Sequence, residues 1–142
     1  MKKFALLCLV VTGACAVHLV SDYDDTTDRE VSQLQRSVDS FLLSLAKNPK
    51  PPACTWQKRS GFYDTTTVAI HSLTIRNRAR DKNQFTVQQL ELLDSSMTTL
   101  EHLHRLKGDS ACMSPEAIEP LRSNFNTSFT AILKLELAKK RG

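Results

Sequence analysis

Residues 86–108 read TVQQLELLDSSMTTLEHLHRLKG, and this stretch predicts one complete amphipathic helix. Its apolar residues recur at spacings of three and four, as they do along one face of a helix. Thr86 is a good N-cap, and Phe85 with Leu90 has the spacing of a hydrophobic staple. Gly108 is typical of the residue that ends a helix in a left-handed conformation. The expected buried face consists of Leu90, Leu93, Met97, Leu100 and either Leu103 or His104.

A second helix is predicted closer to the N-terminus. Thr27 and Glu30 have the spacing of a capping box, in which each side chain bonds the other residue's backbone amide. The prolines within residues 49–52 end this helix, because proline lacks the amide and disfavours a helical residue before it. The apolar stripe consists of Val31, Leu34, Val38, Phe41, Leu42 and Leu45.

The region after these prolines predicts a helix that begins near Ser60 or Gly61. The three threonines of residues 65–67 and Val68 are β-branched and lower the helix propensity, so a strand is the alternative here. Neither a period-two alternation nor a partner strand with hairpin signals supports that strand. The apolar face of the helix is Phe62, Thr66, Ala69, Ile70 and Leu73.

The last helix is predicted to begin at Ser114, a good N-cap that is followed by a proline at the first helical position. Pro120 lies early enough in this helix to be tolerated or to cause a slight kink. The expected buried face is Ile118, Leu121, Phe125, Phe129, Ile132 and either Leu135 or Glu136.

Four amphipathic helices with short connections predict an all-α fold, an up-down-up-down four-helix bundle. Cys54 precedes the second helix and Cys112 precedes the fourth. Those two helix starts lie at the same pole of such a bundle, so a Cys54–Cys112 disulfide would join its two loops. Two buried free thiols are the alternative for this pair.

The first sixteen residues have the order of a secretory signal. Lys2 and Lys3 precede the apolar run of residues 4–11, which is followed by the small residues of 12–16. The apolar run is far shorter than the ~20 residues that cross a bilayer. Ala14-Cys15-Ala16 is an A-x-A site, so cleavage after residue 16 would release a soluble protein.

The same residues suggest a second form of processing. Thr12-Gly13-Ala14-Cys15 resembles a bacterial lipobox, which implies a signal peptide of residues 1–14 and a lipid on Cys15. The resemblance also implies the outer membrane, on its periplasmic or surface side, since Ala16 is not the Asp of an inner-membrane retention signal. We expect residues 15–26 to form a flexible acidic tether and residues 27–142 to form the bundle domain.

The predicted topology brings the tether, the connection after the second helix and the C-terminus to the pole opposite the cysteines. Basic residues gather there, and in an anchored protein they would face anionic head groups. An ordinary solvated loop and helix end is the alternative. These residues are Arg76, Arg78, Arg80, Lys82, Lys139, Lys140 and Arg141.

Catalytic, metal and nucleic-acid signatures are missing from the sequence. Its four glycines leave no phosphate-cradling loop, and no serine lies in a nucleophile motif. His102 and His104 are two apart on a helix, so their side chains diverge and cannot easily share a metal. Without Lys2 and Lys3 the 19 basic residues fall to 17, against 15 acidic ones, too mild a charge for nucleic acid. We expect no enzyme, no metal and no cofactor.

An aromatic and basic cluster beside the disulfide pole is the candidate partner surface, of a composition enriched in interfaces. Its residues are Trp56, Lys58, Arg59, Phe62 and Tyr63. Alternatively, Trp56 and Phe62 cap the bundle core. The sequence favours a non-enzymatic envelope lipoprotein that acts by contact with an envelope protein, as an accessory, inhibitor or exclusion-type protein. A soluble secreted or periplasmic effector or apolar-ligand carrier, and a metal- or haem-binding periplasmic bundle, are the alternatives.

Overall fold

A computed structural model describes residues 20–141 as four long helices without a strand. The helices are α1 (Asp25–Lys47), α2 (Trp56–Arg78), α3 (Gln84–Arg105) and α4 (Pro115–Lys139). The predicted signal sequence and Cys15 lie outside the described residues, as does Gly142.

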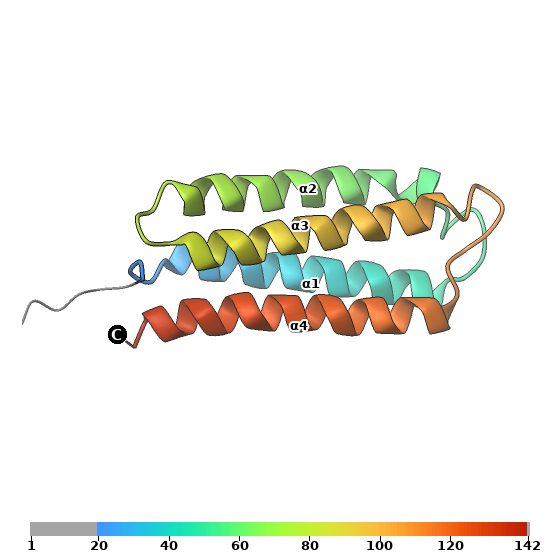
Figure 1. Ribbon diagram of the computed structural model, residues 1–142. Helices are drawn as coiled ribbons and strands as arrows, with labels where there is room; N and C mark the ends of the chain where they lie inside the picture. The colour runs from blue at the N-terminus through green and yellow to red at the C-terminus, as the bar shows by residue number, and fades with distance from the viewer. Residues whose placement is uncertain (1–19, 142) are drawn as a thin grey trace, which may run out of the picture.

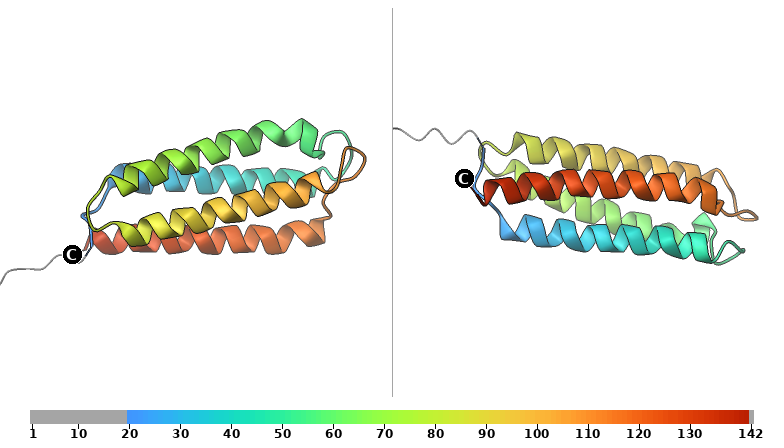
Figure 2. Two further views of the ribbon diagram at one scale, coloured as in Figure 1. Left: turned by 45° about the horizontal axis from the view of Figure 1, so that its top comes forward. Right: turned by 90° about the horizontal axis from the view of Figure 1, so that it is seen from below.

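The chain runs up, down, up and down, as predicted (Figure 1). Each helix packs beside the next one in the chain, and α4 closes the bundle by packing against α1. The closest pairs are α1 with α4 and α2 with α3, while α1 and α2 pack least closely. Figure 2 shows these four helices side by side from two further directions.

The core follows the predicted apolar stripes. It contains most of the residues expected from each helix. Where the sequence left two candidates for one buried position, the polar residue is the buried one, His104 rather than Leu103 and Glu136 rather than Leu135. Each of these two polar side chains is 0% exposed. Among the predicted faces, Phe62, Ala69 and Leu121 are only partly buried and pack against the core from outside.

Helix starts differ from the predictions at three places. The N-cap of α1 is Asp24 and that of α3 is Asn83, so Thr27 and Thr86 lie inside helices and are buried. The Thr27 hydroxyl bonds Asp24 and Asn77, and the Thr86 hydroxyl bonds Glu136, so both bond side chains in place of their own helix amides. The helix α2 begins at Trp56, four residues before Ser60.

Of three further local signals in the sequence, one is not confirmed and two are. Phe85 is 61% exposed, so the predicted staple between Phe85 and Leu90 does not form. The prediction for α4 is confirmed, since Ser114 is its N-cap and its hydroxyl accepts a hydrogen bond from the Ala117 amide at 3.3 Å. Gly108 adopts a φ of 67° just after α3, in agreement with its expected role as a terminator.

The segment before α1 corrects the prediction of a flexible tether over residues 15–26. The Ser21 amide donates to the Lys82 carbonyl at 3.1 Å, and the Ser21 hydroxyl donates to Asn83 Oδ1 at 2.9 Å. Asp24 is buried against Arg76. Residues 21–24 therefore belong to the folded domain, because their polar groups find partners on the α2–α3 connection.

The Cys54–Cys112 disulfide forms as predicted and has a Cα–Cα distance of 5.5 Å. It joins the α1–α2 loop to the α3–α4 loop (Figure 1). Within residues 20–141, no helix has the combination of length and hydrophobicity that crossing a bilayer requires.

Candidate functional site

The two ends of the bundle carry the candidate sites. We call the end with residues 48–55 and 106–114 the disulfide pole. The other end, with residues 20–24, 79–83 and 140–141, is the terminal pole, and it brings together the three segments that the sequence analysis placed there (Figure 1).

A buried hydrogen-bond chain supports the disulfide pole from inside. His104 Nε2 lies 2.7 Å from the Cys54 carbonyl oxygen, and His104 Nδ1 lies 2.8 Å from the Tyr63 hydroxyl. A carbonyl only accepts, so Nε2 carries the imidazole proton and Nδ1 accepts from Tyr63. Burial lowers the pKa of His104 and keeps the ring neutral. The loop that carries Cys54 is thus bonded to α3 as well as to Cys112.

A cation–π pair forms the outer surface of the disulfide pole. The Arg105 guanidinium carbon lies 4.4 Å from the centroid of the Trp56 ring. Glu101 Oε1 accepts from Trp56 Nε1 at 3.3 Å and from Arg105 at 3.0 Å, which fixes both side chains. Leu106, the next residue, is 69% exposed. The arrangement presents an ordered aromatic ring and an arginine beside an exposed leucine.

The predicted partner surface needs correction at two of its five residues. Tyr63 is 1% exposed, because its ring packs in the core and its hydroxyl bonds His104. Phe62 stacks on Phe41 with ring centroids 3.7 Å apart, which leaves it only partly accessible. Lys58 is exposed, and Arg59 bonds the Ala53 carbonyl at 2.7 Å.

Arg105 and Leu106 were missed by the sequence analysis. Both follow the last apolar position of α3, so periodicity alone counts them as an ordinary helix end. The signal in the sequence that could have identified them is a leucine that lies outside the apolar stripe and next to a basic residue. We define the contact surface as Trp56, Lys58, Arg59, Arg105 and Leu106.

At the terminal pole, most of the predicted basic residues are already engaged. Arg76 makes two bonds to Asp24, at 2.8 and 2.9 Å, and holds the pKa of that carboxyl far below its usual value. Arg78 pairs with Glu91 at 2.6 Å, and Arg80 donates to the Asp22 carbonyl. These arginines hold the protein's own segments together, which weakens their predicted role as a membrane-facing cluster.

Lys139 departs furthest from the prediction of an exposed basic residue. Its side chain is 3% exposed, and its ammonium group donates to Glu136, Asn83 and the Thr86 hydroxyl. Thr86 also donates to Glu136 Oε1 at 2.7 Å. Among the described residues, Glu136 Oε2 is a buried acceptor without a hydrogen-bond partner. This polar cluster ties the end of α4 to the start of α3.

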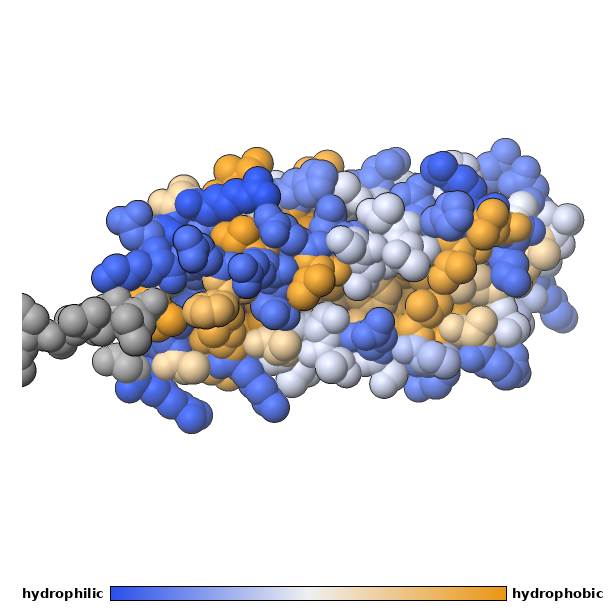
Figure 3. All heavy atoms as spheres, viewed as in Figure 1, coloured by the Kyte–Doolittle hydropathy of each residue, from blue (hydrophilic) through white to orange (hydrophobic). Residues whose placement is uncertain are grey.

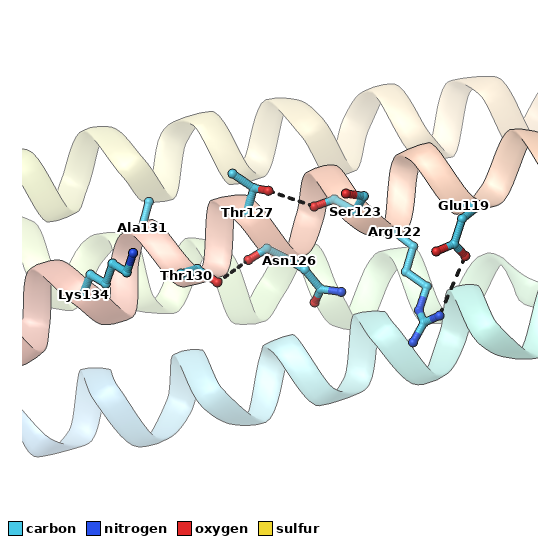
Figure 4. A pocket seen from close by; sticks show the side chains of 8 residues that line it. All are labelled: Glu119, Arg122, Ser123, Asn126, Thr127, Thr130, Ala131 and Lys134. Atoms are coloured by element: carbon cyan, nitrogen blue, oxygen red, sulfur yellow. Dashed lines mark hydrogen bonds and ion pairs between the residues drawn. The ribbon is translucent and has the colours of Figure 1, made fainter.

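A surface hollow of about 640 Å³ lies along α4 (Figure 4). The Thr127 hydroxyl donates to the Ser123 carbonyl and the Thr130 hydroxyl to the Asn126 carbonyl, so neither is poised as a nucleophile. Arg122 binds Asp39 on α1 through two hydrogen bonds. The hollow is a shallow polar surface whose groups hold α4 in place.

The described residues contain no group of three or more His, Cys, Asp or Glu side chains placed to hold a metal ion. His71 pairs with Asp94 at 3.4 Å across α2 and α3, and His102 is exposed. Comparisons with protein families, curated proteins and solved structures find no match to this chain.

Proposed function

We propose that this protein is a non-enzymatic, exported envelope protein that is anchored by a lipid on Cys15 and acts by binding another protein. The observation that carries the proposal is the Arg105–Trp56 pair beside the exposed Leu106. Tryptophan and arginine are over-represented among the residues that dominate interface energies.

The rigidity of the disulfide pole supports this proposal. The disulfide and the His104–Cys54 bond hold the loop before α2, and the bonds of Glu101 hold the side chains of Trp56 and Arg105. A surface that is already ordered loses little conformational entropy on binding, so more of the contact energy remains as affinity. The disulfide is also typical of proteins that work outside the reducing cytosol.

Site-specific photocrosslinking in the producing cells tests the contact. A photoreactive residue at position 106 should give one discrete crosslinked product, which Arg105→Ala weakens by removing the cation over Trp56. Position 68 is the matched control, because Val68 is 65% exposed against 69% for Leu106 but lies in the middle of α2, away from the contact surface. Equal products at both positions, or none at position 106, would contradict the proposed contact.

The anchor has a separate test, the intact mass of the processed protein from a bacterial host. We expect the chain from Cys15 onward with a diacylglycerol and an acyl chain added. A mass that begins at Val17 without lipid would exclude the anchor and leave the contact surface unaffected.

The apolar-ligand carrier is a second candidate because of one groove. Between α1 and α2, the least closely packed neighbours, a groove of about 400 Å³ has Leu34 and Leu73 among its lining residues. Fatty acid that binds the purified protein, and is lost when Ala69→Arg fills the groove, would favour the carrier over protein contact.

A further inference from the structure

Four exposed apolar side chains surround the terminal pole, each at the end of a different element. Val20 precedes α1, Ile75 is in the last turn of α2, Phe85 is in the first turn of α3, and Leu137 is in the last turn of α4. Their exposed fractions are 37%, 68%, 61% and 43%. We call these four residues the apolar collar. Figure 3 shows hydrophobic side chains among hydrophilic ones on the face that it draws, including the part towards the terminal pole.

Aromatic and basic groups accompany the apolar collar. Lys140 and Arg141 are exposed at the end of α4, and the Lys140 ammonium lies 5.0 Å from the centroid of the Tyr23 ring. The Tyr23 hydroxyl donates to Asp28 at 2.7 Å, so this corner is ordered. Aromatic and basic side chains around an apolar surface are typical of regions that lie at a membrane–water interface.

Few residues lie between Cys15 and the folded domain. Since Ser21 is bonded to the α2–α3 connection, only residues 16–20 separate Cys15 from the bundle. Five residues span at most about 18 Å, whereas the eleven residues of the predicted tether would span about 40 Å. A lipid on Cys15 would therefore keep the terminal pole close to the head groups.

We propose that the terminal pole rests on a phospholipid membrane surface, with the apolar collar in the head-group region and the bundle standing away from it. This inference rests on the proposed lipid anchor. Since Arg76, Arg78 and Arg80 are paired with acidic or carbonyl groups, the apolar collar makes the main contact with the membrane, and the exposed basic groups at the end of α4 add to it. Helices of about 23 residues then hold the contact surface roughly 35 Å from the membrane.

The single tryptophan of the chain makes the orientation measurable. The chain from Cys15 onward is coupled through that thiol to maleimide-lipid vesicles that contain phospholipids brominated near the head group. The oxidised Cys54–Cys112 pair leaves Cys15 as the reactive thiol. In the otherwise unchanged protein, the fluorescence of Trp56 should not be quenched by the brominated lipids. In a Trp56→Phe background, the fluorescence of Phe85→Trp should fall about twofold, since interfacial apolar groups lie about 5–10 Å into the head-group boundary.

Leu92→Trp in the same background is the matched control, because Leu92 and Phe85 are both 61% exposed and lie on one helix. Position 92 is about 10 Å further from the pole and should show little quenching. In the Phe85→Trp protein, the double substitution of Ile75 and Leu137 by serine should reduce the quenching. The double substitution of Val68 and Leu106 by serine should leave it unchanged. Equal quenching at positions 56, 85 and 92, or none at 85, would overturn the orientation.

The result of the quenching measurement does not depend on the result of the mass test. Chemical coupling supplies the anchor, so the quenching pattern reports the orientation even if the native protein carries no lipid. A mass that includes the lipid, together with equal quenching at positions 56, 85 and 92, would support the anchor but exclude contact between the apolar collar and the membrane.

Discussion

His104 Nε2 donates to the Cys54 carbonyl over 2.7 Å, which links the third helix to the loop that carries the disulfide. The other ring nitrogen, Nδ1, accepts from Tyr63. Protonation would turn that acceptor into a donor and leave the buried Tyr63 hydroxyl proton without its partner. The ring is therefore a structural group whose neutral form the fold requires.

This relationship predicts a loss of stability in mild acid. The folded pKa of His104 is lowered by burial, so the unfolded state binds the proton more readily, and the free energy of unfolding should fall as pH decreases below about 6.5. Urea unfolding at pH 7.5 and 5.5 measures the difference. His104→Gln keeps a donor near Cys54 but does not titrate, so it should show a smaller pH dependence than the wild type.

Two carboxylates that are paired with arginines titrate outside that pH range. The pKa values of Asp24 and Asp39 are lowered, mainly by hydrogen bonds from Arg76 and Arg122, so both titrate at more acidic pH. An unchanged pH dependence in His104→Gln would show that His104 is not the group responsible.

Removal of the disulfide should cost stability without changing the helices. Cys54 and Cys112 are 58 residues apart, and closing a loop of that length contributes about 4 kcal/mol on the chain-entropy model. The double serine variant should keep the helical circular dichroism and unfold at lower urea concentration. A loss below about 1 kcal/mol would mean that the loops are held mainly by other contacts, such as the His104 bond.

The buried Lys139–Glu136 pair predicts a non-additive mutation series. Lys139→Met leaves the Glu136 carboxylate buried without its cation and should cost about 3–5 kcal/mol. The double variant Glu136→Leu with Lys139→Met removes both charges and should recover much of that loss, since apolar replacements of buried pairs are often close to neutral. Urea unfolding of the two single variants and the double variant gives the coupling energy. Simple additivity would contradict the buried pair.

Asp24→Asn tests whether residues 21–24 are part of the fold. Asp24 is nearly buried while Arg76 is 44% exposed, so the cost at neutral pH should be only about 1 kcal/mol. Because the folded pKa of Asp24 is lowered, its contribution is fully present above about pH 4 and declines as pH falls below that value. The difference in stability between the variant and the wild type should therefore be smaller at pH 2 than at pH 7.

Amide hydrogen exchange reports the same segment directly. The Ser21 amide donates to Lys82 and should be protected in the wild type and exchange faster in Asp24→Asn. Rapid exchange in both proteins would restore the flexible tether that the sequence predicted.

Local signals in the sequence were enough for the architecture. The spacing of Leu90, Leu93, Met97 and Leu100 identifies one buried face because helical periodicity depends only on neighbouring residues. Four such faces with short connections leave few topologies, and the positions of Cys54 and Cys112 agree with one of them. The Ser114 cap was also correct, because no distant side chain competes for its hydroxyl among the described contacts.

Sequence patterns failed where a distant partner outweighed a local one. Thr86 looks like an N-cap, yet Glu136 and Lys139, about 50 residues away, offer its hydroxyl buried partners. The Thr27 hydroxyl likewise accepts a hydrogen bond from Asn77, 50 residues away on α2. A cap pattern records only the neighbouring amides, so it cannot anticipate a charged pair that α4 brings to the start of α3.

The sequence by itself therefore determined the four helices, their order and the disulfide, since each depends on local periodicity or on which loops share a pole. Only the tertiary structure decided which polar and aromatic groups are accessible. Tyr63 and Lys139 are buried by packing, while Arg105 and Phe85 remain at the surface. Exposure is set by what the neighbouring helices cover, and that depends on contacts between residues far apart in the chain.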